Sequence, residues 1–270
     1  MEGGLYLPPQ YVPGKRYPLV IQTHGFDPDR FWIAGPYSSA FAAQPLASQG
    51  MVVLQMNDSF HDVTDTPQEA ERAMHAYESA IDYLDREGII DRGRVGLIGF
   101  SRTCFYVKYA LTHSQKHFSA AIVSDGIDAG YLQYLLFYDQ TSGLALEFES
   151  LIGGEPFGAG LALWMKNSPG FLVDRVKTPL LIQAIGPDSL LGEWQWFKGL
   201  ERLNRPVDLV YLPEGSHVLV KPWERMASEE GSLDWLCFWL SGRENTDTSK
   251  AAQYSHWRAL RSRIDPSASK

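Results

Sequence analysis

The chain has 270 residues, of which 44% are hydrophobic and 21% charged, and its formal net charge is −8. That length can bury a full hydrophobic core, and the acidic balance argues against nucleic acid as the main partner. No apolar run is long enough to span a bilayer, and the first residues lack the basic and apolar regions of a signal peptide. We therefore expect a cytoplasmic protein, or a periplasmic or secreted one if an N-terminal region is missing.

The first third of the chain alternates strand and helix signals. Residues 5–9 predict an edge strand, and the apolar run at 18–23 predicts a buried strand that leads into His24-Gly25-Phe26. A helix is expected over about 39–49, where Gly50 suits its C-terminus. Thr66-Pro67-Gln68-Glu69 has the pattern of a capping box, so it predicts the start of a helix that ends at Gly88.

Several short runs along the chain are apolar throughout rather than alternating, and helix-length segments separate most of them. Strands buried on both faces and joined by helical crossovers predict a doubly wound, mostly parallel sheet. The runs lie at 18–23, 51–56, 95–98, 119–124, 179–184 and 207–212. In such a sheet, ligands bind at the carboxyl ends of the strands.

Two further segments complete the expected organisation. Residues 126–178 are rich in Tyr, Phe, Leu and Trp and too long for a plain crossover, so they predict an insert or cap before the strand at 179–184. In the tail, 244–270, three apolar residues recur at helical spacing: Tyr254, Trp257 and Leu260. We expect this tail to form a helix that docks on the main domain, which spans 1–243, although its basic residues also allow a patch for a partner.

The segment from Arg94 to Cys104 reads RVGLIGFSRTC and carries the main chemical signal. An apolar strand ends in Gly99-Phe100-Ser101 and a helix-like stretch follows, which is the layout of a nucleophile elbow. Small residues are needed where the strand and helix come close, and Gly99 fills the first such position. Thr103 stands at the second, where glycine is usual. The segment predicts an α/β-hydrolase fold with Ser101 as nucleophile.

A serine hydroxyl needs a histidine to take its proton and a carboxylate to orient that histidine. In this fold the order along the chain is serine, acid, histidine. His217 follows the last predicted strand and is therefore the expected base. The acid is expected after the strand at 179–184, where Asp188 is the first choice. Glu193 and Asp125 are the alternatives, the latter because some hydrolases take the acid one strand earlier.

An oxyanion hole requires N–H donors already in position. We expect the backbone N–H of Arg102 to be the first donor and the N–H of Gly25 or Phe26 to be the second. The Arg102 side chain could either bind a substrate carboxylate or pair with a nearby acid, and the His24 ring is expected to be structural.

The sequence gives little support for a metal or another cofactor. Two cysteines, Cys104 and Cys237, are too few for a zinc site or a disulfide framework. His61 has Asp58 and Asp62 nearby, but these residues share one loop without a distant ligand. The glycine-rich stretch at 153–160 lacks the strand-to-helix context of a phosphate loop.

With these elements placed, residues 5–260 resemble the catalytic domain of the prolyl oligopeptidase family of serine peptidases. The similar stretches are LYLPP, KRYPLVI, RVGLIGFS and the passage from SP at 168–169 to PLLI at 179–182. Within the family, GFSRTC, Asp125-Gly126 and LDW with FWL near the end look most like the lasso-peptide isopeptidase branch.

The resemblance implies an acyl-enzyme mechanism on small peptides, with Ser101, His217 and Asp188 as the triad. In the family a β-propeller usually precedes this domain and screens substrates by size, and we expect these 270 residues to form the catalytic domain without it. A missing N-terminal domain, a partner subunit or a preference for larger substrates would each account for this. A carboxylesterase on the same triad is the nearest alternative. A non-catalytic binding protein on a hydrolase scaffold is the other, since Thr103 departs from the motif.

Overall fold

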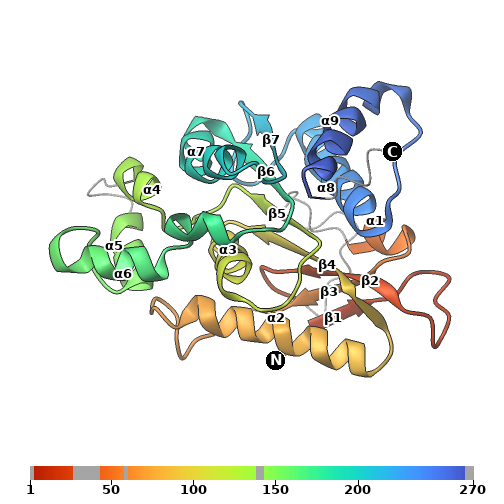
Figure 1. The fold of residues 1–270 in the computed structure, drawn as a ribbon, viewed down its shortest axis with the longest axis horizontal. Helices are drawn as coiled ribbons and strands as arrows, with labels where there is room; N and C mark the ends of the chain where they lie inside the picture. Colours follow the sequence, from red (N-terminus) through yellow and green to blue (C-terminus); the bar gives the residue numbers. More distant parts are fainter. Residues whose placement is uncertain (1–2, 27–42, 58–59, 138–142, 265–270) are drawn as a thin grey trace.

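A computed structural model describes residues 3–26, 43–57, 60–137 and 143–264, and in these residues one seven-stranded sheet crosses the molecule (Figure 1). The strand order is β1-β3-β2-β4-β5-β6-β7. Only β1 runs antiparallel to its neighbour; the other pairs are parallel. The predicted α/β-hydrolase sheet is confirmed. The strands are β1 (Gly3–Tyr6), β2 (Tyr17–Gln22), β3 (Val52–Met56), β4 (Ile90–Phe100), β5 (Ala120–Ser124), β6 (Leu180–Ile185) and β7 (Val207–Leu212).

Helices cover both faces of this sheet (Figure 1). Successive residues of a strand point to opposite faces. Leu97 of β4 therefore joins one core cluster while Ile98 joins the other. The first cluster includes side chains of α2 (Glu69–Arg86), α3 (Thr103–His113) and α7 (Gly186–Arg202). The second includes side chains of α1 (Ala43–Ser48), α8 (Pro222–Ser241) and α9 (Ala251–Ser262). This double burial explains why the strands read as continuous apolar runs.

The start of α2 differs from its prediction. The helix begins at Glu69, and the Thr66 hydroxyl donates to the carbonyl of Val63 instead of capping the helix. The Glu69 carboxylate accepts the N–H of Asp65 at 2.7 Å and also binds a side chain of α3, described below. The predicted apolar face of α2 is buried. Of the helix expected over 39–49, residues 39–42 lie outside the described part of the chain.

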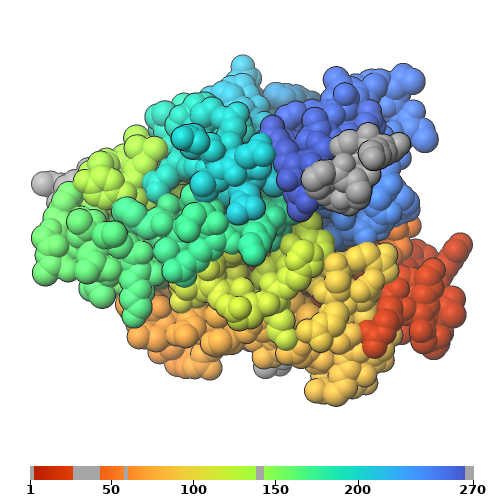
Figure 2. All heavy atoms as spheres, in the orientation of Figure 1, coloured from red at the N-terminus to blue at the C-terminus, as the bar shows by residue number. Residues whose placement is uncertain are grey.

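The insert folds into short helices at the left of the molecule in Figures 1 and 2. They are α4 (Tyr131–Leu136), α5 (Leu144–Ile152) and α6 (Leu161–Asn167), with 3₁₀ turns at Gly158–Gly160 and Pro169–Arg175. Trp164 is fully buried among them, and its indole N–H donates to the carbonyl of Gly154 at 2.7 Å. The buried apolar side chains of the insert therefore belong to the first core cluster of the sheet.

The tail helix α9 packs against α8. Trp257 meets Trp235 with ring centroids 5.1 Å apart, and its indole N–H donates to Asp208 of β7 at 2.6 Å. Tyr254 and Leu260 are buried beside it. After α8 the chain passes through a 3₁₀ turn at Thr248–Lys250. The three apolar positions that predicted a docked helix thus lie in the second core cluster.

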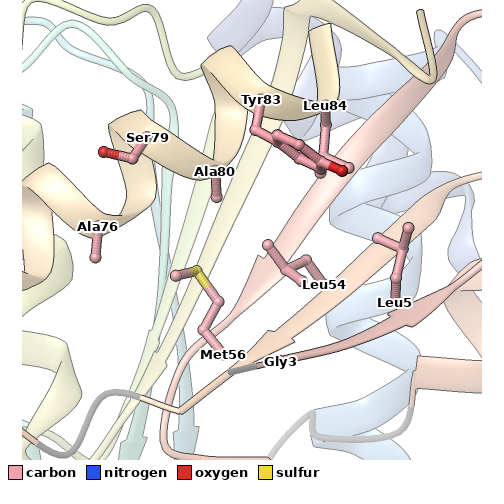
Figure 3. Close-up of a pocket in the computed structure, with 9 residues that line it drawn as sticks. All are labelled: Gly3, Leu5, Leu54, Met56, Ala76, Ser79, Ala80, Tyr83 and Leu84. Carbon is pink, nitrogen blue, oxygen red and sulfur yellow. The ribbon is translucent and has the colours of Figure 1, made fainter. Parts of the chain in front are cut away.

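An apolar hollow of about 310 Å³ lies at the edge of the sheet, between β1, β3 and α2 (Figure 3). Leu54 and Met56 face it from β3, and Tyr83 and Leu84 face it from α2. Its lining includes none of the residues that form the site described next. Within the described residues, no helix is both long and apolar enough to cross a membrane.

Candidate active site

Ser101 lies at the apex of a tight turn between β4 and α3, with φ of 53°. A positive φ is costly for a residue other than glycine, and such strain is typical of functional turns. The turn needs a glycine at position 99, because a Cβ there would lie 3.0 Å from the carbonyl oxygen of Thr103 and from Val107. The N–H of Ser101 donates to the carbonyl of Ser124 at 3.1 Å, which ties the turn to β5. The predicted elbow geometry is present.

Thr103 is accommodated without loss of this turn. Its side chain is buried, and its hydroxyl oxygen accepts the N–H of Phe100 at 3.0 Å. The same hydroxyl lies 2.6 Å from the hydroxyl of Thr23, which follows β2. The departure from the usual glycine therefore adds hydrogen bonds that join the elbow to the end of the neighbouring strand.

His217 lies in the loop after β7, with its Nε2 atom 3.0 Å from Oγ of Ser101. Its ring stacks on Phe100, with centroids 4.6 Å apart and planes at 22°. The loop approaches β6 so closely that a Cβ on Gly215 would lie 2.6 Å from Ile185. The His217 side chain is 53% exposed, so its ring is open to solvent.

The carboxylate that meets His217 belongs to Asp125, at 2.6 Å between Oδ2 and Nδ1. Asp125 directly follows β5 with φ of 44°, and its side chain is only 14% exposed. If Nδ1 carries the proton, His217 donates it to Asp125 and leaves Nε2 free to accept the proton of Ser101. The geometry is therefore that of a serine–histidine–aspartate relay.

The structure corrects the expected position of the acid. Asp188 is exposed in the first turn of α7, because Gly186 takes φ of 77° and the chain enters the helix at once. No loop remains after β6 to carry Asp188 to His217. The carboxylate thus follows β5, the strand before the insert at 126–178. We expected it to follow β6, the strand after the insert.

Glu193, the second candidate, is also placed elsewhere. It is fully buried in α7, and its Oε2 atom accepts a hydrogen bond from Nζ of Lys108 at 2.7 Å. Burial raises its pKa to about 7, although the ammonium of Lys108 acts in the opposite direction. It points into the core behind the site.

Asp125 reaches His217 because its loop packs tightly on the elbow. A Cβ on Gly126 would overlap Sγ of Cys104 on α3, so only glycine permits this approach. The N–H of Asp125 donates to the carbonyl of Gln183 at 2.9 Å, and the N–H of Ile127 donates to the carbonyl of Ser101 at 3.3 Å. The acid loop is thus bonded to the nucleophile turn itself.

Of the three backbone N–H groups expected as oxyanion donors, one already donates a hydrogen bond within the fold. The N–H of Gly25 donates to the carbonyl of Met56 at 3.1 Å, so the expectation for Gly25 is wrong. Among the described residues, no backbone hydrogen bond of a turn or loop has the N–H of Arg102 or of Phe26 as its donor. The His24 ring lies 5.3 Å from the Phe100 ring, and burial lowers its pKa. It packs beside the site and does not join the relay.

The Arg102 side chain pairs with acidic side chains of the protein, which is one of the two alternatives expected for it. Its Nε and Nη2 atoms bind both oxygens of Glu69, at 2.8 and 2.7 Å. Nη2 also lies 2.6 Å from Asp65, and Nη1 pairs with Glu147 of α5. Nothing in the sequence around Arg102 points to partners as distant as these. The arginine thus joins the elbow to α2 and to the insert.

No group of three or more potential ligands suited to a metal occurs among residues 3–26, 43–57, 60–137 and 143–264. His61 is described, whereas Asp58 lies outside these ranges. Both cysteines are buried and free, and burial raises the pKa of the Cys104 thiol.

Comparison with known proteins identifies relatives across the chain. The family model for the prolyl oligopeptidase family matches residues 37–243. The lasso peptide isopeptidase AtxE2 of Asticcacaulis excentricus is 32% identical over 95% of this chain, which covers 38% of the relative. Dipeptidyl-peptidase 5 of Porphyromonas gingivalis is 23% identical over 87% of the chain and 35% of its own length. A solved structure of apo AtxE2 isopeptidase superposes with a TM-score of 0.83 and 30% identity, over 97% of this chain and 41% of that one.

Proposed function

The chain belongs to the prolyl oligopeptidase family, and from this membership we propose that it is a serine hydrolase that cleaves peptide or isopeptide bonds of small peptides. The observation that carries the proposal is the continuous contact from Ser101 through His217 to Asp125, at 3.0 and 2.6 Å. A relay of this kind activates a hydroxyl that is otherwise a weak nucleophile.

The proposed reaction begins when Oγ of Ser101 attacks the carbonyl carbon of the scissile bond. Nε2 of His217 takes the hydroxyl proton, and the carboxylate of Asp125 stabilises the imidazolium that forms. The backbone N–H of Arg102 and that of Phe26 are the proposed donors to the oxyanion. His217 then gives the proton to the leaving nitrogen, and an acyl group stays on Ser101. Water then attacks the acyl carbon while His217 takes its proton, and His217 returns this proton to Oγ of Ser101 as the ester C–O bond breaks and the acid product leaves.

The substrate class is the part of the proposal that depends on relatives. The chain spans only 38% and 35% of the length of these two curated relatives, so their full activities are proposals for it. A peptide substrate suits the isopeptidase and dipeptidyl-peptidase relatives. The exposed ring of His217 leaves room for a further domain or a partner subunit to limit access, and we propose that such a part controls substrate size.

Parallel assays with short peptide amides, a peptide containing an isopeptide bond and p-nitrophenyl esters test this proposal. We expect amide or isopeptide turnover in the wild type and its loss in Ser101→Ala. Ester turnover without amide or isopeptide turnover would favour the carboxylesterase alternative. Binding of the peptides with no turnover of any substrate, unchanged by Ser101→Ala, would support a binding protein.

A further inference from the structure

A buried ion cluster lies behind the Asp125 loop, and the proposed reaction does not use it. Lys108 of α3 is completely buried, with Nζ at 2.7 Å from Glu193 of α7 and 3.6 Å from Oδ2 of Asp128. Both carboxylate side chains are at most 1% exposed. Removing such charges from water is costly, and hydrophobic residues of similar size often stabilise a protein as well or better. Stability alone is therefore a weak reason for this cluster.

Asp128 is held firmly within the loop that carries Asp125. Its Oδ1 atom accepts the N–H of Gly130 at 2.7 Å. The side-chain amide of Gln133 accepts the N–H of Asp128 at 2.7 Å and donates to the carbonyl of Gly126 at 2.9 Å. Because these bonds hold residues 126–130 together, a change in the position of the Asp128 carboxylate should also change the position of Asp125.

The buried charge on the other oxygen of Asp128 is offset by the ammonium group of one neighbouring lysine. Oδ2 is buried and has no hydrogen-bond partner, and among the ion pairs of the described residues it faces the ammonium of Lys108. Lys108 in turn belongs to the helix that begins directly after Ser101 and Arg102. The contact from Lys108 to Asp128 thus connects the nucleophile helix to the acid loop through the core.

We propose that Lys108 is a positioning residue, which holds Asp128 and its loop so that Asp125 stays in contact with His217. The inference rests on the proposed function, because it takes Asp125 as the group that orients His217. Glu193 then has a different role, since it accepts a hydrogen bond from the same lysine but belongs to α7 and not to the acid loop.

Two amide variants around the same lysine separate these roles. Asp128→Asn keeps the shape of the loop but removes the attraction to Lys108, whereas Glu193→Gln removes the other pair and leaves that attraction in place. The measured quantity is the second-order rate of Ser101 acylation by a fluorophosphonate, followed by intact mass between about pH 5 and 9. Near-UV circular dichroism checks that each variant is folded.

We expect Asp128→Asn to acylate about tenfold to a hundredfold more slowly, as expected for a small misplacement of a catalytic group. The midpoint of its pH profile should move to lower pH, because a carboxylate held less closely stabilises the imidazolium less. Glu193→Gln should stay within about threefold of the wild type. The other titratable groups that face this region, His24 beside His217 and Cys104 beside Lys108, are the same in all these proteins.

Equal rates and equal midpoints for folded Asp128→Asn and wild type would overturn the inference, as would equal losses in both variants. If Asp128→Asn does not fold, Lys108→Gln combined with Asp128→Asn and Glu193→Gln removes all three charges and leaves none unpaired, and the inference requires the same slow, shifted profile. A wild type that fails to react with the fluorophosphonate would instead refute the proposed function. The two failures are therefore distinguishable.

Discussion

If Asp125 orients His217, its replacement should lower activity strongly, whereas replacement of Asp188, the acid expected from the sequence, should not. Asp125→Asn preserves size and keeps the loop packed on Cys104, but replaces the carboxylate 2.6 Å from Nδ1 of His217 with an amide. If the amide N–H₂ faces Nδ1, it stabilises the tautomer with the proton on Nε2, which cannot accept a proton from Ser101.

The expected loss follows from the chemistry of this contact. The same substitution in a serine–histidine–aspartate triad lowers kcat by about 10⁴. At about 1.36 kcal/mol for each factor of ten, this is about 5 kcal/mol of transition-state stabilisation. Because His217 is half-exposed and water can partly replace the carboxylate, we expect a loss between about 10³ and 10⁴ in kcat, with little change in KM.

Asp188→Asn is the matched control, because it makes the same chemical change at an exposed position in the first turn of α7. We expect its activity to stay within about threefold of the wild type and its stability to fall by less than about 1 kcal/mol, the usual value of an acid near a helix N-terminus. Steady-state kinetics on an activated ester measure both variants. A large loss in Asp188→Asn, with Asp125→Asn near the wild type, would refute the reasoning.

Two further predictions concern stability. Burial raises the pKa of Glu193 from 4.5 to about 7, so the native state binds the extra proton and stability should fall as pH rises through this window. This proton contributes about 3 kcal/mol at most to the free energy of unfolding. Urea unfolding at about pH 5 and 8 should show that the free energy of unfolding falls less in Glu193→Gln than in the wild type. An identical fall in both proteins would contradict the assignment. Gly126→Ala should lose about 1–3 kcal/mol from its overlap with Cys104. Gly231→Ala, with open space around its new Cβ in α8, should be neutral or stabilised; equal melting temperatures for these two variants would refute the packing argument.

Much of the site was predictable because its signals are local. A strand followed by Gly99-Phe100-Ser101 and a helix specifies the elbow within a few residues, and His217 lies in the short loop after the last strand. The apolar runs that predicted the strands are buried on both faces, so the pattern and the fold have the same cause.

The acid was harder to predict, because an aspartate follows a strand end both at 125 and at 188. The choice depends on backbone geometry that the residue types do not reveal. Gly186 turns the chain into α7 at once, whereas Gly126 lets the β5 loop close against Cys104. The approach of Gly126 to Cys104 joins residues 22 positions apart, which no local pattern specifies.

Long-range pairing explains the other departures. Thr66 to Glu69 has the sequence of a capping box, but Glu69 binds Arg102, which is 33 residues away, and α2 begins without that cap. Likewise the N–H of Gly25 is taken by Met56 on the neighbouring strand, which removes it from the candidate oxyanion donors. Such competition between local and distant partners is settled only in the folded chain.

The most direct test of the account is intact-mass spectrometry after incubation with a fluorophosphonate, with Ser101→Ala as the control. The proposal predicts one adduct on the wild type and none on the variant, because Ser101 is the hydroxyl in contact with His217. A folded wild type that acquires no adduct, or a Ser101→Ala variant that still acquires it, would contradict the central claim that this serine is an activated nucleophile.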